Sequence, residues 1–129
     1  MNLTEFSKEV HENAVNHGWW EQERTFGEII ALCHAELSEA LEEYRNESIT
    51  KNRINIQGLP MLYYSGEGYI ANAVTKVCKK PEGIAVELAD CILRILDYCG
   101  KENIDIETIL KLKHEYNRSR PYKHGGKKI

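Results

Sequence analysis

The segment from Ile84 to Cys99 constrains the fold more than any other part of this chain. Almost every position in it is apolar, and its few charged side chains fall within an arc of about 80° when the segment is drawn as a helix. These side chains belong to Glu87, Asp90, Arg94 and Asp97. An ordinary surface helix has the opposite pattern, in which the apolar stripe is the narrow one. The segment therefore predicts a mostly buried helix with a thin charged seam.

A second acidic seam is expected on an earlier helix. Residues 25–28 read Thr-Phe-Gly-Glu, a capping-box pattern before an apolar run, which predicts a helix from near Phe26 to about Arg45. Three acids lie within about 60° of one another on that helix, and they are Glu36, Glu39 and Glu43. Two acidic seams that face one another would repel, and a bound dication would reverse the sign of that interaction.

One acidic pair from each seam therefore supplies candidate metal ligands, which are Glu36, Glu39, Glu87 and Asp90. Glu43 is a candidate auxiliary ligand. Because every donor is an oxygen, the set favours Mg²⁺, with Mn²⁺ as the other choice. The alternative interpretation is a solvated acidic face that pairs with Arg94 and with lysines. For Asp97 we favour an ion pair with Arg94 over a metal role.

The rest of the chain also has helical patterns. Apolar side chains recur at helical spacing over residues 5–17, and Gly18 predicts the end of that helix. We expect a short helix over about 69–79, a helix from about 82 that stops at Gly100, and a last helix from Asp105, an N-cap candidate, to about Arg118. Strand patterns are scarce. The sequence therefore predicts an all-α fold, an antiparallel bundle of four to five helices in a single domain over 1–129.

Composition narrows the class of protein. The chain has 129 residues, of which 42% are hydrophobic and 29% charged, as in globular proteins. No apolar run approaches the roughly 20 residues that span a bilayer, and the first residues lack the basic and apolar regions of a secretory signal. The four cysteines have no CxxC spacing and lie in apolar segments. We therefore expect buried, reduced thiols in a cytoplasmic protein with no membrane partner.

The end of the chain is basic. Residues 111–129 contain seven Lys or Arg and a single acid, Glu115, and residues 119–129 are expected to form a basic arm. Positive groups there suit phosphate oxygens, and a disordered basic tail is the alternative. The sequence has no GxxxxGK[ST] loop and nothing that resembles a nucleic-acid-binding module. Trp20 is a candidate for stacking on a nucleobase, with core packing as the alternative.

Taken together, these residues resemble the MazG-like, all-α nucleoside triphosphate pyrophosphohydrolases. The family signature is an E-x-x-E pair on one helix and an E-x-x-D pair on a later one. Here the pairs lie in HAELSEALEEYR and GIAVELADCILRILDYCG, and the closing KHEYNRSRPYKHGGKKI is similar to the tail of small phage and bacterial members. The resemblance covers about residues 20–45 and 82–129. The 47 residues from Ala40 to Val86 are a longer separation than is usual in the family, so we interpret residues 46–80 as an insertion.

The resemblance implies hydrolysis of a nucleoside triphosphate to the monophosphate and pyrophosphate. It implies that the four acids hold Mg²⁺ on the triphosphate and that the metal or one of the glutamates activates the attacking water. We choose Glu39 as the base. The residues that it implies for triphosphate binding are Lys113, Asn117, Arg120 and Lys123. Family members form dimers or tetramers, so we expect a homodimer or homotetramer. Two rival hypotheses stay open: a pyrophosphatase selective for dUTP or dCTP, and a non-catalytic helical oligomer that binds nucleotides or a protein partner.

Overall fold

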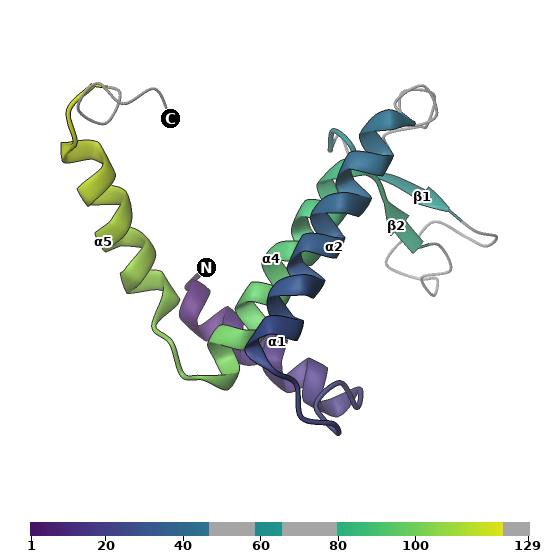
Figure 1. The fold of residues 1–129 in the computed structure, drawn as a ribbon, viewed down its shortest axis with the longest axis horizontal. Helices are drawn as coiled ribbons and strands as arrows, with labels where there is room; N and C mark the ends of the chain where they lie inside the picture. Colours follow the sequence, from purple (N-terminus) through teal and green to yellow (C-terminus); the bar gives the residue numbers. More distant parts are fainter. Residues whose placement is uncertain (47–58, 66–79, 123–129) are drawn as a thin grey trace. The chain divides into compact units, whose positions relative to one another are not determined.

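A computed structural model describes residues 1–46, 59–65 and 80–122 of the chain. In these residues the structure is mostly helical (Figure 1), which confirms the all-α class. The helices are α1 (Leu3–Asn16), α2 (Phe26–Arg45), α4 (Ile84–Lys101) and α5 (Ile106–Ser119), and the strands are β1 (Tyr63–Ser65) and β2 (Lys80–Glu82). The helix predicted over 69–79 lies outside the described residues. Within the described ranges, no helix is both long and apolar enough to cross a membrane.

Side-chain caps fix where the helices begin. The Thr25 hydroxyl accepts a hydrogen bond from the Glu28 amide at 3.1 Å, and α2 begins at Phe26, as the capping box predicts. Asp105 caps α5 by accepting from the Thr108 amide at 3.2 Å, which confirms it as an N-cap. Helix α1 begins at Leu3, two residues earlier than expected, because Asn2 accepts from the Glu5 amide.

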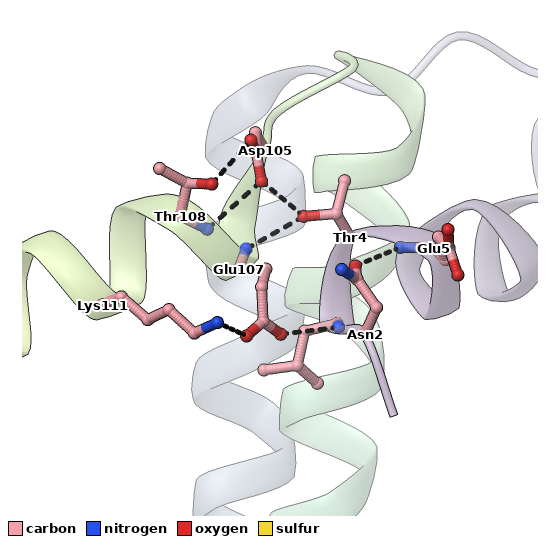
Figure 2. Close-up of polar contacts among 8 residues, drawn as sticks. Asn2, Thr4, Glu5, Asp105, Glu107, Thr108 and Lys111 are labelled. Atoms are coloured by element: carbon pink, nitrogen blue, oxygen red, sulfur yellow. Dashed lines mark hydrogen bonds and ion pairs between the residues drawn. The ribbon is translucent and has the colours of Figure 1, made fainter.

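The described chain divides into two compact units, Met1–Gln22 with Leu96–Ile129, and Glu23–Ile95. In the first unit the N-termini of α1 and α5 cap one another (Figure 2). The Thr4 hydroxyl donates to Asp105 at 2.7 Å and accepts from the Glu107 amide at 3.0 Å, while the Glu107 carboxylate accepts from the Leu3 amide at 2.8 Å. Amides of a helix's first turn have no partner within the helix, so this exchange satisfies groups on both helices.

Gly100 joins α1 to the end of α4. We expected α4 to stop at Gly100, but the helix continues to Lys101, so that prediction is wrong. A Cβ at Gly100 would lie 2.3 Å from the Ser7 carbonyl oxygen and 2.7 Å from the His11 Cβ. The absence of a side chain at Gly100 therefore allows the backbones of α1 and α4 to lie close together, and the glycine does not end the helix. By contrast Gly18, which follows α1, has a φ of 81°, and the prediction that the helix ends there is confirmed.

The second unit places α2 beside the first turns of α4. Buried apolar side chains in it include Ile29, Cys33 and Ala40 of α2 and Cys91 of α4. Cys33, Cys91 and also Cys99 are buried free thiols, as predicted, and Cys78 lies outside the described residues. Burial raises the pKa of the Cys33 and Cys99 thiols, so both favour the neutral form.

A short antiparallel ribbon precedes α4 and was not predicted from the sequence. Strands β1 and β2 pair Tyr63 with Glu82 and Ser65 with Lys80. The chain before β1 touches the start of α4, where the Ala85 amide donates to the Met61 carbonyl at 3.1 Å. A Cβ at Gly83, whose φ is 120°, would lie 2.3 Å from that carbonyl oxygen. This contact fixes the ribbon to the α4 N-terminus, close to Glu87.

Candidate metal centre

Three carboxylates from two helices meet in the second unit. One oxygen each from Glu36 and Glu39 of α2 and from Glu87 of α4 lie within 4.8 Å of one another. Glu36 is buried, Glu87 is half-buried and Glu39 is exposed, so the group reaches from the protein interior to solvent. We call these three residues the acid cluster. It brings together both predicted seams at the positions that helical spacing selected.

Arg94 of α4 contacts the buried member of the acid cluster. Its Nε donates to the Glu36 Oε1 at 2.8 Å, and the Glu36 side chain is 10% exposed. Burial alone would raise the pKa of Glu36, but the hydrogen bond from Arg94, the hydrogen bonding shared with Glu39 and Glu87, and the Arg94 charge outweigh it and lower that pKa. Glu36 is therefore held as a carboxylate.

The pKa of Glu87 is shifted in the opposite direction from that of Glu36. Burial first, and then hydrogen bonding and repulsion from Glu39 and the charges of Asp90 and Glu36, raise its pKa to about 7. Its Oε2 atom is buried and has no hydrogen-bond partner within the described part of the chain. A buried oxygen of this kind costs free energy unless a cation or a donor compensates it. The donor set and this orphaned atom fit a hard divalent cation.

Asp90, the fourth predicted ligand, lies near the acid cluster but is not one of its three converging oxygens. Burial and then the Glu36 charge raise its pKa, while the charges of Arg94 and of Lys80 on β2 act in the opposite direction. The Asp90 carboxyl group therefore interacts electrostatically with charged side chains of both helices and of the ribbon.

Glu43, the predicted auxiliary ligand, has a different partner and lies outside the three converging oxygens. The Tyr63 hydroxyl donates to its carboxylate, with oxygens at 2.9 and 3.0 Å, and Tyr63 is 6% exposed. Sequence reasoning missed this tyrosine because it lies in an irregular segment with no periodic signal. The bond instead attaches β1 to the last turns of α2.

Asp97 belongs to the first unit, where it holds an aromatic pair. We expected it to pair with Arg94. The donors that the structure gives it are the His11 Nδ1 at 2.8 Å and the Trp20 Nε1 at 3.0 and 3.1 Å. The His11 and Trp20 rings meet edge to face at 5.7 Å, and the Lys101 ammonium lies 5.3 Å from the Trp20 centroid. The indole of Trp20 is thus fixed in orientation.

The residues implied for triphosphate binding lie on and after α5, in the first unit. Lys113 and Asn117 are exposed on α5, and Arg120 follows the helix. The Lys113 and Arg120 charges lie 4.7 and 5.7 Å from the Tyr116 ring centroid. Lys123 lies outside the described residues.

Comparison with protein-family models, with curated proteins and with solved structures finds no match to this chain.

Proposed function

We propose that this protein is a Mg²⁺-dependent nucleoside triphosphate pyrophosphohydrolase of the MazG-like type. The observation that supports this most is the meeting of Glu36, Glu39 and Glu87, on helices far apart in sequence. One buried oxygen of Glu87 has no hydrogen-bond partner among the residues that the structure describes. A set of carboxylate oxygens on two helices suits a cation that carries a polyphosphate, because Mg²⁺ commonly keeps ligand positions for phosphate.

The chain's residues have separate roles in this proposal. Glu36, Glu87 and Asp90 would hold the cation together with Glu39, and the cation would supply charge neutralisation at the phosphates. Glu39, the exposed member, would accept the proton of a water whose oxygen attacks the α-phosphorus. The bond between that phosphorus and the bridging oxygen breaks in line, and pyrophosphate leaves with the electron pair. Lys113, Asn117, Arg120 and Lys123 are the residues that the resemblance implies for triphosphate binding.

Base selectivity belongs to the same proposal. Trp20 is the candidate for stacking on the base; its indole nitrogen donates to Asp97, and the Lys101 ammonium lies 5.3 Å from its ring centroid. A protein selective for dUTP or dCTP is the narrower form of this function. A panel of ribo- and deoxynucleoside triphosphates, compared by kcat/KM, separates the broad form from the narrow one.

The decisive experiment measures pyrophosphate and orthophosphate separately, with Mg²⁺ and without it. The proposal expects pyrophosphate as the direct product, and orthophosphate as the direct product would contradict it. Glu39→Gln should lower kcat by about 100-fold or more if Glu39 is the base. Glu42→Gln is the matched control, because Glu42 is exposed on the same helix and pairs with Arg45.

A non-catalytic helical oligomer is the competing hypothesis. It predicts that Glu39→Gln leaves function intact, and it requires no Mg²⁺-dependent rise in Tm. We also propose a cytosolic location, supported by the three free buried thiols, and self-association into a dimer or tetramer, supported by the exposed apolar side chains of α2.

A further inference from the structure

Arg94 occupies a specific position in the proposed cation site. Its Nε bond to Glu36 is short, at 2.8 Å, and the two side chains are only 28% and 10% exposed. The bond crosses from α4 to α2. A charge-assisted bond of this length in a partly buried place is one of the stronger polar interactions of a small domain.

A nearby positive charge stabilises the acid cluster. Three carboxylates with oxygens inside 4.8 Å, and Asp90 nearby, would repel strongly if all were ionised. The positive charge that the structure supplies at Glu36 is the Arg94 guanidinium. Arg94 therefore does in the cation-free chain what a bound dication does in the proposed enzyme.

Two cations cannot share this place without cost. A guanidinium bonded to Glu36 Oε1 and a dication bonded to the same carboxylate would be a few ångströms apart, where like charges repel in a low-dielectric setting. We propose that Arg94 is the internal counter-ion of the acid cluster, and that a divalent cation must displace its guanidinium from Glu36 in order to bind. This inference rests on the proposed function for the identity of the site but concerns cation binding, not hydrolysis.

Calorimetric titration with Mg²⁺ at pH 8 tests the competition without any nucleotide. Arg94→Gln removes the competing charge, so its Mg²⁺ Kd should fall about tenfold relative to wild type. Its Tm in EDTA should drop, and its rise in Tm on adding Mg²⁺ should exceed that of wild type. Arg45→Gln is the matched control: it removes an equal charge from the exposed Arg45–Glu42 pair of α2 and should leave the Mg²⁺ Kd unchanged within about twofold.

The wild-type chain gives a second readout that does not depend on whether the variant folds. In ¹H–¹⁵N spectra, the Arg94 Nε–H resonance, identified by sequential assignment of the wild-type protein, should move in step with the Mg²⁺ titration. A resonance that stays fixed while Mg²⁺ binds would overturn the proposal, as would equal Mg²⁺ Kd values for wild type and Arg94→Gln; either result leaves the hydrolase proposal standing. Mg²⁺ binding to Arg94→Gln alone would support the counter-ion role. Absence of binding to both proteins would overturn this inference and the proposed function together.

Discussion

At the level of single residues, Glu87 links the cluster's electrostatics to stability. Its pKa of about 7 lies well above the ordinary 4.5, because burial and neighbouring carboxylates disfavour its charge. Between about pH 4.5 and pH 7, the folded chain therefore keeps a proton on Glu87 that the unfolded chain has already released. Stability falls with rising pH wherever the folded state binds more protons. Without a divalent cation, Glu87 therefore makes the folded chain less stable above pH 7 than at low pH.

This gives a prediction for Glu87→Gln. In EDTA, raising the pH from 5.5 to 8.0 should lower the free energy of unfolding of the wild type by at least about 1 kcal/mol more than that of the variant. The size follows because one pKa unit corresponds to about 1.4 kcal/mol. Urea denaturation of both proteins at the two pH values measures it. Equal pH dependence in the two proteins would show that Glu87 does not titrate in this window.

Tyr63 carries a second prediction at this scale. Its hydroxyl donates to Glu43 from a nearly buried ring. Tyr63→Phe should lower the free energy of unfolding by about 1–2 kcal/mol, because the Glu43 carboxyl group loses the tyrosine hydroxyl that donates to it.

Tyr44→Phe is the control for the loss of a hydroxyl, since Tyr44 is exposed on α2. It should change stability by less than about 0.5 kcal/mol. Matching losses in the two variants, measured by urea denaturation, would assign no stabilising role to the Tyr63–Glu43 bond.

The sequence predicts only some of these residue-level contacts. Helical spacing selects Glu36, Glu39 and Glu87 because it fixes which side chains share a helix face. It gives no information about Tyr63, whose partner lies 20 positions away in an irregular segment. The same reason explains His11, which meets Asp97 across 86 positions. Hydrogen-bond partners that are far apart in the sequence depend on how the elements pack, and local periodicity does not predict that packing.

At the level of elements, the contact between α1 and α4 depends on a missing side chain. Gly100→Ala would bring a Cβ to 2.3 Å from the Ser7 carbonyl oxygen, so one backbone must move. We expect a loss of about 1–3 kcal/mol in the free energy of unfolding. Thermal and urea denaturation measure it.

Gly27→Ala is the matched control for Gly100→Ala. Among the atoms that the structure describes, a Cβ at Gly27 would meet only the Thr25 hydroxyl oxygen, at 3.9 Å. Alanine also favours a helix over glycine by about 0.8–1 kcal/mol. This variant should therefore be neutral or more stable than wild type. A loss at Gly27 equal to that at Gly100 would contradict the steric explanation.

Element boundaries were predictable where a cap sets them. Thr25 and Asp105 select the starts of α2 and α5 through bonds inside one helical turn, so four residues of sequence contain the signal. The prediction at Gly100 was wrong because a glycine near a helix end can have two roles. It can adopt the left-handed conformation that ends a helix, or it can let another backbone approach closely, and only the neighbouring helix distinguishes the two. The β1–β2 ribbon is too short for alternation to reveal it.

At the level of the whole molecule, α2 carries an exposed apolar stripe whose centre lies about 140° around the helix from the centre of its acidic seam. Its large exposed apolar side chains fall within about 60° of the helix circumference, and they are Phe26, Ile30, Leu37, Leu41 and Tyr44. Contiguous exposed apolar surface of this kind marks an interaction site more often than a free surface. The proposed dimer or tetramer would bury it against a second copy of the chain.

Leu41→Glu tests this association, because it places a charge in the stripe at a side chain that is 50% exposed in the single chain. A charge at the centre of an apolar interface must be desolvated, so the variant should be monomeric where wild type is oligomeric. Light scattering coupled to size-exclusion chromatography gives both masses at matched concentration. Ser38→Glu adds the same charge to an exposed position on another face of α2 and should keep the wild-type mass. A monomeric wild type, or a Leu41→Glu variant with the wild-type oligomeric mass, would contradict the prediction, because the stripe would then need no second copy.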